Sequence, residues 1–456
     1  MRNRIRELIG KYNQQCDYME VRIEESTETS IRFSGRELET ISTRAELGGC
    51  VRCLVNGSWG FASFNTLDDI ERFAEMALAQ ARLLGQQKTV LAEVQPIEDD
   101  VALTLKKDPR GLPLDAKVSL MKGYNDLING YSREITSSTV VYFDRYHKIG
   151  FANSEGTNIV QEKMDIAGVC SAICAEGDKT RAQRVVFGSN DDYSCAEGLE
   201  EKVREACQNA ILQLRAPKVK AGRYTVIADP ALTGVFIHEA FGHLSEGDNV
   251  YENKKMQELM TLGAVYGSEK LNVYDTGLQM GSRGYLKYDD EGVPTEKTYL
   301  IKAGKLVGRL HSRETAGTMH EKPTGNARAL SYRFPPICRM RNTCVQAGDV
   351  SFEEMIEDID LGVYAINTTG GETWHELFTF GAERGYMIRK GKIAEMVRDV
   401  TLSGNVFTTL KNIDAIGSDQ TLHNGPGGCG KAAQMPLPVG EEGPHIRIRD
   451  VIIGGE

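Results

Sequence analysis

Two helical patterns with strand-like segments between them open the chain. Apolar residues at helical spacing predict a short helix over 3–14, and a longer helix is expected over 66–84, with Asn65 as its N-terminal cap. Residues 18–64 alternate apolar and polar positions and are broken by Asn-Gly-Ser-Trp-Gly, which is typical of strands joined by turns. The buried face of the first helix is expected to comprise Ile5, Leu8, Ile9 and Tyr12.

The same order of elements returns further along the chain. Residues 86–114 contain three prolines and no sustained periodicity, so they are expected to form a connector. Helical spacing reappears over 115–130, strand-like alternation over 134–188, and helical spacing again over 196–214. A helix–strands–helix unit used twice indicates an internal duplication.

The pattern changes after about residue 220, where glycine becomes frequent and short alternating segments dominate. These segments predict antiparallel sheet, with 353–360 as one of few helices. The fold class is therefore α+β. We expect an N-terminal α+β domain over 1–220, with the duplicated unit at 1–86 and 115–216, and a C-terminal domain over 221–456 that carries a metal-binding helix.

Composition and charge exclude several classes of protein. The 456 residues carry a net charge of −10 without a Lys/Arg-rich block, so we expect no direct nucleic-acid binding. The longest apolar runs fall short of the ~20 residues that a membrane span needs. The basic N-terminus lacks the apolar stretch of a signal peptide, so a cytoplasmic location is expected. Ten dispersed cysteines are then expected to be mostly reduced thiols.

A well-marked helix start precedes the segment Ile-His-Glu-Ala-Phe-Gly-His. The preceding Arg-Tyr-Thr-Val-Ile-Ala reads as a strand, Asp229 is a good N-cap, and Pro230 is favoured at the first helical position. The predicted helix runs from 230 to about 244 and places His238 and His243 in its second half.

The spacing of these two histidines decides whether they can share an ion. A regular helix separates residues four apart by ~40° and residues five apart by ~140°, so His238 and His243 would point in different directions. A π-bulge, one extra residue in a turn, would bring both onto one face, and Gly242 weakens the helix at that point. The alternative is one histidine in the core and the other in solvent.

A zinc site needs a third protein ligand. The candidates include Glu246, Asp248 and Cys429, whose glycine-rich surroundings let backbone approach an ion closely. The same segment has the Gly-x4-Gly-Lys spacing of a P-loop up to Lys431, but Ala432 replaces the hydroxyl residue that would bind magnesium. The remaining candidates are His147, His311, His320, His375, His423 and His445.

Several segments of the C-terminal half resemble the TldD/PmbA family of metalloproteases, often labelled modulators of DNA gyrase, and in particular its TldD branch. They include DPALTGVFIHEAFGHLSEGD, GSRGYLKYDDEGVPTEKTYLIKAGKLVG, PTGNARALSY, CRMRNT, GVYAINTTGGE and GGCGKAAQMPLPVG. These segments lie in family order over most of residues 225–456. The resemblance rests on His-Glu-x-x-x-His followed far downstream by a Cys-Gly-Lys cysteine.

The resemblance implies a zinc site with one Zn²⁺ per chain. His238, His243 and Cys429 would be the ligands, and Glu239 would be the general base that takes a proton from the attacking water. A thiolate ligand makes the ion a milder Lewis acid and the site oxidisable, which fits a reducing compartment.

Five further residues have both a functional and a structural interpretation. Glu246 and Asp248 either orient a ligand histidine or are solvated acids that follow a helix end. Arg283, Arg328 and Tyr332 lie in segments that resemble the family, and either contact substrate or form ordinary structural bonds.

The resemblance further implies a zinc-dependent endopeptidase that hydrolyses short or unfolded peptides. A sheet-rich half can bind such a peptide in extended form, as an added strand. Family members assemble from two chains, so we expect a homodimer or a heterodimer with a PmbA-like subunit. The alternatives are a non-proteolytic metal-dependent amidase and a catalytically silent scaffold subunit.

Overall fold

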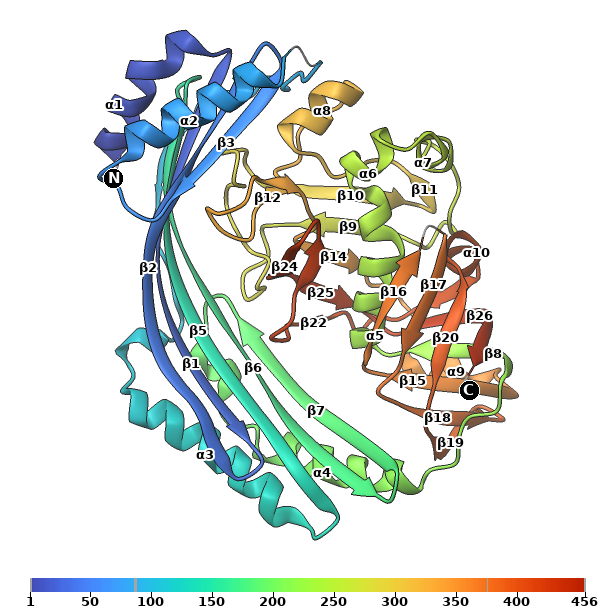
Figure 1. Ribbon diagram of the computed structural model, residues 1–456. Coiled ribbons are helices and arrows are strands. Elements are labelled where there is room, and N and C mark those ends of the chain that lie inside the picture. Colours follow the sequence, from blue (N-terminus) through green and yellow to red (C-terminus); the bar gives the residue numbers. More distant parts are fainter. Residues whose placement is uncertain (1, 86–87, 375, 455–456) are drawn as a thin grey trace.

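One curved sheet contains most of the N-terminal half (Figure 1). In this computed structural model, which describes residues 2–85, 88–374 and 376–454, the sheet has seven strands. They are β1 (Tyr18–Ser34), β2 (Glu37–Val55), β3 (Ser58–Phe64), β4 (Glu98–Val101), β5 (Ile135–Asn153), β6 (Asn158–Glu176) and β7 (Lys179–Ser189). The order is β3-β2-β1-β5-β6, and both β4 and β7 pair with β6.

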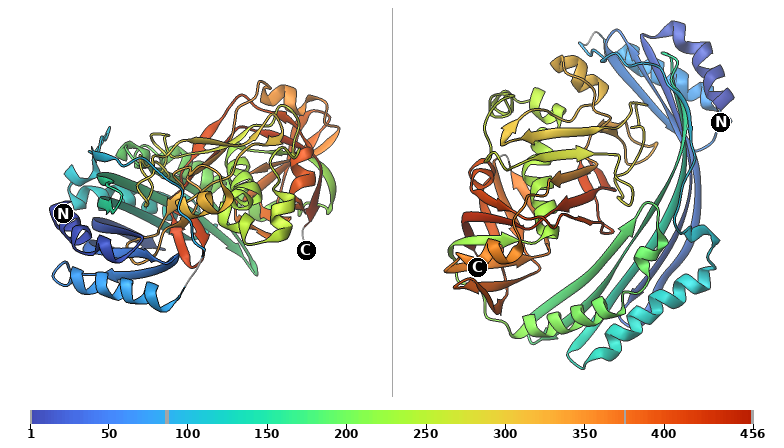
Figure 2. Two further views of the ribbon diagram at one scale, coloured as in Figure 1. Left: turned by 90° about the horizontal axis from the view of Figure 1, so that it is seen from above. Right: turned by 180° about the vertical axis from the view of Figure 1, so that it is seen from behind.

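Four helices cover one face of this sheet, and the C-terminal half lies against the other (Figures 1 and 2). They are α1 (Arg2–Tyr12), α2 (Ile70–Leu83), α3 (Leu114–Tyr131) and α4 (Glu200–Arg215). Alternation along β1 explains this arrangement, because Val21 packs with α1 and α2 whereas Ile31 on the same face packs with α3 and α4. The helix α2 lies so close to β3 that a Cβ on Gly60 would be 1.8 Å from the carbonyl oxygen of Ala77.

The helix–strands–helix order expected from the sequence is observed in both units, with differences at the element ends. The second helix begins at Ile70 rather than 66, with Asp69 at its N-cap, and Asn65 instead accepts a hydrogen bond from Tyr332. The prediction of an Asn65 cap is therefore wrong. The expected connector contains β4, which pairs in parallel with β6. The helix expected from 196 begins at Glu200.

Two sheets build the C-terminal half. The larger has nine strands, in the order β16 (Gly370–Trp374), β17 (Leu377–Gly381), β20 (Thr401–Asn405), β26 (Ile446–Gly454), β8 (Gly222–Ala228), β15 (Leu361–Ile366), β18 (Arg384–Arg389) and β19 (Lys392–Val397), with β21 (Ile413–Ile416) beside β26. The smaller has the order β11 (Lys305–Leu306), β10 (Lys297–Lys302), β9 (Val273–Thr276), β14 (Asn342–Val345), β25 (Gly440–Gly443) and β22 (Thr421–His423). Pairing is antiparallel except for β8–β15 and β14–β25, so the predicted α+β class is confirmed.

Short elements complete this half. Two small hairpins consist of β12 (Ala327–Arg328) with β13 (Ile337–Cys338) and β23 (Cys429–Lys431) with β24 (Gln434–Leu437). The helices are α5 (Pro230–Ile237), α6 (Gly247–Tyr251), α7 (Lys254–Leu259), α8 (Arg313–Met319), α9 (Phe352–Glu357) and α10 (Val406–Lys411). The α5 helix lies between the two sheets, since Phe236 stacks on Phe378 and Phe380 of β17 while Gly234 contacts the backbone of β25.

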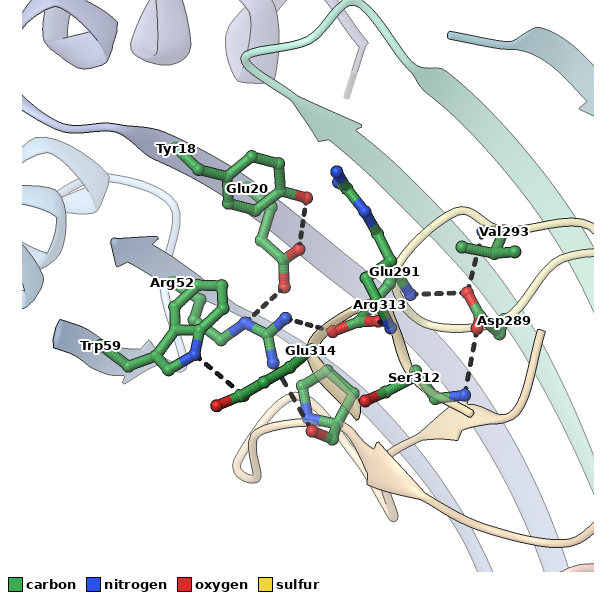
Figure 3. Close-up of polar contacts among 12 residues, drawn as sticks. Tyr18, Glu20, Arg52, Trp59, Asp289, Glu291, Val293, Ser312, Arg313 and Glu314 are labelled. Atoms are coloured by element: carbon green, nitrogen blue, oxygen red, sulfur yellow. Dashed lines mark hydrogen bonds and ion pairs between the residues drawn. The ribbon is translucent and has the colours of Figure 1, made fainter. Parts of the chain in front are cut away.

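A buried ion network joins the curved sheet to the C-terminal half (Figure 3). The Arg52 guanidinium lies 2.8 Å from the Glu20 carboxylate on the neighbouring strand and 2.5 Å from Glu291 of the C-terminal half. Trp59 stacks on Arg52 at 4.0 Å and donates a hydrogen bond to Glu314 of α8. Because these charges are buried, the two halves are held in one orientation.

Across the ranges described above, none of the helices combines the length and apolar character that crossing a membrane would require.

Candidate metal centre

The helix that carries the two histidines changes its winding where they lie. The Asp229 carboxylate accepts a hydrogen bond from the Leu232 amide and begins α5, as the sequence predicts. Regular α-helix ends at Ile237 and is followed by a π-helical turn, His238–Gly242, and a 3-10 turn, His243–Ser245. The inserted residue predicted from the five-residue spacing is thus present. Only this distortion lets both imidazoles lie on one side of the helix.

Three potential metal ligands converge at this turn. The nearest ligand atoms of His238, His243 and Cys429 all lie within 4.8 Å of one another. The Cys429 sulfur is 3.3 Å from Nε2 of His243, and the two imidazole rings are perpendicular with centroids 5.3 Å apart. A tetrahedral zinc ion with these ligands would need separations of roughly 3.3–3.8 Å, so a small contraction suffices. Two imidazoles and a soft thiolate favour zinc.

The pKa values of the cysteine and of one histidine are shifted in directions that favour binding of a cation. Burial alone would raise the pKa of the Cys429 thiol, but the imidazoles of His238 and His243 outweigh it and lower this pKa to about 4. Burial lowers the pKa of His243, yet the Glu246 carboxylate and Cys429 raise it well above its ordinary value. Without metal, the lowered pKa of Cys429 and the raised pKa of His243 therefore favour a thiolate beside an imidazolium. A divalent cation would replace the imidazolium proton.

Glu239 stands at the open side of the group. Its carboxylate is 29% exposed and lies 3.9 Å from Nε2 of His243, the nitrogen that faces Cys429. It lines a cavity of about 370 Å³ together with Gly430 and Lys431. A carboxylate at this place can reach a water molecule or a substrate group in the cavity and exchange protons with it.

Glu246 orients one of the histidines. Its side chain is fully buried, and Oε2 lies 3.0 Å from Nδ1 of His243, 3.0 Å from Nζ of Lys431 and 3.3 Å from Nδ2 of Asn249. Burial would raise the pKa of Glu246, but Lys431 and His243 lower it to about 2. The ionised carboxylate fixes the His243 ring with Nε2 toward Cys429.

Asp248 contacts no histidine among the residues that the structure describes. Its Oδ1 is 2.6 Å from Nζ of Lys431. Lys431 therefore links Asp248 to Glu246 and also donates to the Cys338 carbonyl. Sequence reasoning missed Lys431, although the Cys-Gly-Lys motif contains it.

The other candidate residues have protein partners. Arg283 pairs with Asp165 at 2.6 Å and donates to the carbonyls of Gly425 and Gly427, which precede Cys429. The buried Arg328 guanidinium donates to the Met340 and Pro438 carbonyls, and the Tyr332 hydroxyl donates to Asn65. These side chains hold segments together around the site.

One more arginine supports the cysteine. The fully buried Arg339 donates to the Cys429 carbonyl at 2.8 Å and to the Gln434 carbonyl at 3.2 Å, which fixes the β23–β24 hairpin. Sequence reasoning missed this role. Arg339 lies in the segment CRMRNT, but such a match carries no information about which distant carbonyl the side chain reaches.

The other histidines that the structure describes do not join the centre. His311 bonds Thr315 and Glu321, and His445 bonds Tyr364 and Asp419. Within residues 2–85, 88–374 and 376–454, His238, His243 and Cys429 form the one group of three that could hold a metal. His375 lies outside the described residues.

Comparison with known proteins shows the family to which the chain belongs. Residues 19–81 match PmbA/TldA metallopeptidase domain 1, residues 107–214 match the central domain, and residues 221–455 match the C-terminal domain. The chain is 46% identical to "Metalloprotease slr0863" of Synechocystis sp. over 99% of this chain and 97% of that protein. It is 29% identical to "Zinc metalloprotease TldD homolog" of Saccharolobus solfataricus, covering 91% of each.

A solved structure shows the same fold at low identity. TldE from Thermococcus kodakarensis superposes with a TM-score of 0.82 and 18% identity, covering 99% of this chain and 100% of that one. The sequence matches extend over all three parts of the chain and include the residues of the metal centre. This chain therefore belongs to the TldD/PmbA family of metallopeptidases.

Proposed function

We propose that this chain is a zinc-dependent endopeptidase of the TldD type that hydrolyses short or unfolded peptides. The observation that carries the proposal is the convergence of His238, His243 and Cys429 with the Glu239 carboxylate on their open side. Two imidazoles and a thiolate supply three ligands, which leaves a fourth position for water or substrate.

Glu239 and Glu246 have different roles in the proposed hydrolysis. Zinc, when bound, supplies a Lewis acid that polarises a peptide carbonyl and lowers the pKa of a coordinated water toward ~7. Glu239 accepts the proton of the attacking water and returns it to the leaving amine. Glu246 holds the His243 ring in one tautomer by accepting a hydrogen bond from Nδ1.

The edge of the larger sheet supports extended binding of substrate. The strand β16 is the last strand of that sheet, and in the described residues it pairs with β17 alone. Glu372 and Thr373 of β16 line the same cavity as Glu239. A peptide added along this edge would be held through its backbone and pass the metal centre, largely independent of its side chains.

Zinc content and peptide hydrolysis test the proposal together. We expect about one zinc per chain in the wild type and a sharp loss in Cys429→Ser, because that variant lacks the soft ligand. Cys16→Ser, which replaces a half-buried thiol remote from the centre, is the control and should keep its zinc.

Glu239→Gln separates binding from chemistry. It should retain zinc but lose about 10²–10⁴-fold in hydrolysis of several unrelated peptides, because the proton acceptor is gone. Unchanged hydrolysis in Glu239→Gln would refute the mechanism. Zinc-replete wild type that cleaves no peptide but hydrolyses small amides would favour an amidase, and inactivity on both would favour a silent subunit.

We further propose that the chain works as a dimer, either with a second copy or with a PmbA-like subunit. Light scattering of the purified chain, alone and mixed with a PmbA-like protein, would distinguish the two. A monomer in both experiments would refute dimerisation.

A further inference from the structure

A second cavity is lined by residues of α5 that precede the two histidines along the chain. Its volume is about 400 Å³, and its walls come from α5, from β6 and β7 of the curved sheet, and from the loop before Cys429. Most of its exposed lining is apolar, contributed by Val169, Val186, Ala231, Val235 and Pro426. None of the residues assigned to the metal centre lines it.

Residues of α5 and of the cysteine loop line the two cavities in the same order along the chain. Ala231 and Val235 of α5 line the second cavity, and Glu239, four residues further on, lines the first. The loop that carries the cysteine follows the same order, because Gly425 and Gly427 line the second cavity whereas Gly430 lines the first. An extended peptide that fills the first cavity can therefore continue into the second.

Glu441 and His423 line this cavity from the smaller sheet, on which α5 packs. They are direct cross-strand neighbours on β25 and β22, so their side chains lie on the same face of the sheet. The Glu441 side chain leaves the sheet beside Gly234, one helical turn before His238, since a Cβ on that glycine would be 3.0 Å from the Glu441 Cβ. Glu441 is therefore close to the metal centre.

Both residues have unused hydrogen-bonding capacity. In the described part of the chain, the Glu441 carboxyl group makes no hydrogen bond or ion pair, and burial raises its pKa although His238 opposes that shift. The buried Nε2 of His423 has no partner. Burial and the nearby Lys202 ammonium lower the pKa of His423 to about 4, so its imidazole is neutral. With its proton on Nδ1, that imidazole presents Nε2 as an acceptor.

The other charged residues that line this cavity are already paired, and Lys202 lines a neighbouring cavity that His423 also borders. Arg184, which also lines the cavity, donates to the Glu383 carboxylate and to the Thr368 carbonyl. Glu383 in turn accepts a hydrogen bond from Asn367. The free groups in this cavity are thus two acceptors, one of them a carboxylate, next to an apolar wall.

We propose that Glu441 and His423 bind a primary ammonium group of the substrate, either the amino terminus of a peptide or a lysine side chain. An ammonium group has three donors and no acceptor, so it matches a carboxylate and a neutral imidazole. The apolar wall accommodates the carbon atoms attached to it. This inference rests on the proposed peptidase function and adds a specificity determinant to it.

Binding to a non-hydrolysing variant tests this inference independently of turnover. The zinc-loaded Glu239→Gln protein is titrated calorimetrically with a hexapeptide of uncharged residues that has either a free or an acetylated amino terminus. Two further acetylated peptides carry lysine or norleucine at the second position. Each titration is repeated with Glu441→Gln added, and with Glu395→Gln added as a control, because Glu395 lies remotely on β19 and pairs with Arg389.

We expect the peptide with a free amino terminus to bind more tightly than its acetylated form, or the lysine peptide to bind more tightly than the norleucine peptide. Glu441→Gln should reduce the ratio of the two affinities by roughly 30-fold or more. Loss of the preference for the free terminus would identify the amino terminus as the ligand, and loss of the lysine preference would identify the side chain. Glu395→Gln should change neither. If Glu441→Gln does not fold, Glu441→Asp, which retracts the carboxylate by one methylene, should weaken the same preference.

Two results would overturn the inference while leaving the peptidase proposal intact. One is equal binding of all four peptides, which would mean that the cavity accepts apolar groups only. The other is a preference that Glu441→Gln leaves unchanged. Failure of every peptide to bind would instead overturn the proposed function and this inference with it.

Discussion

Glu246 and Asp248 are both acidic, lie two residues apart and contact the same lysine, yet the structure predicts that only Glu246 contributes strongly to zinc binding. Glu246 is fully buried and accepts a hydrogen bond from Nδ1 of His243, whereas Asp248 contacts Lys431 and no described histidine. Replacing each by its amide, Glu246→Gln and Asp248→Asn, removes one charge and keeps the size. Glu246→Gln therefore tests the orientation of His243, and Asp248→Asn is the matched control for the loss of one negative charge.

The magnitude follows from the contacts of Glu246. Its pKa is lowered from 4.5 to about 2, which corresponds to about 3 kcal/mol in favour of the ionised form. Because the folded-state pKa is depressed, this contribution is fully present above pH 4.5 and is lost as the pH falls toward 2. At neutral pH the amide variant loses all of it. A carboxylate that accepts a hydrogen bond from a metal-ligating histidine typically raises metal affinity by about 10–100-fold. We expect Glu246→Gln to lose that factor.

Zinc affinity is measured by competition with a chromophoric chelator at neutral pH, and circular dichroism checks that each variant is folded. Asp248→Asn should change the dissociation constant by less than about threefold, because it touches no ligand histidine. An equal loss in both variants would mean that the total negative charge matters rather than the contact with His243. Unchanged affinity in Glu246→Gln would refute the role assigned to Glu246.

Three further outcomes are expected. Arg52→Met should destabilise the protein by about 3–5 kcal/mol in denaturant unfolding, because it removes the cation between two buried carboxylates. Arg389→Met, at an exposed ion pair, should cost at most about 1 kcal/mol, and similar losses in both variants would refute the role of the buried ion network. Gly242→Ala places a methyl group 2.0 Å from a buried methionine sulfur and should lower the unfolding free energy by about 1–3 kcal/mol and weaken zinc binding, while Gly130→Ala, with open space around it, should do neither. In the zinc-free protein Cys429 should react with iodoacetamide down to about pH 5, because its pKa is lowered to about 4; a rate that already falls below pH 8, as for an ordinary thiol, would show that the imidazoles do not hold a thiolate.

Local chemistry made the helix around the metal centre predictable. Asp229 and Pro230 mark its start, and the five-residue spacing of His238 and His243 admits a shared ion only if a π-turn separates them. The structure contains that turn. The start of α2 was predicted wrongly, because Asn65 and Asp69 are both suitable N-cap residues. The Asn65 side chain instead accepts a hydrogen bond from Tyr332 of the other half of the chain.

The sequence by itself determined the repeated helix–strands–helix order, the α+β class and the position of His238 and His243 at the end of a helix. Periodicity, caps and motif spacing act within a few residues, so they can be read from the sequence. Only the tertiary structure decided that Glu246 and not Asp248 reaches His243, that Arg283 and Arg339 hold the cysteine loop, and that Glu441 lies beside α5. These relations join residues that are distant along the chain or that point to different sides of one turn. They depend on how two sheets and a curved layer pack, and pairwise packing over such separations leaves no periodic signal in the sequence.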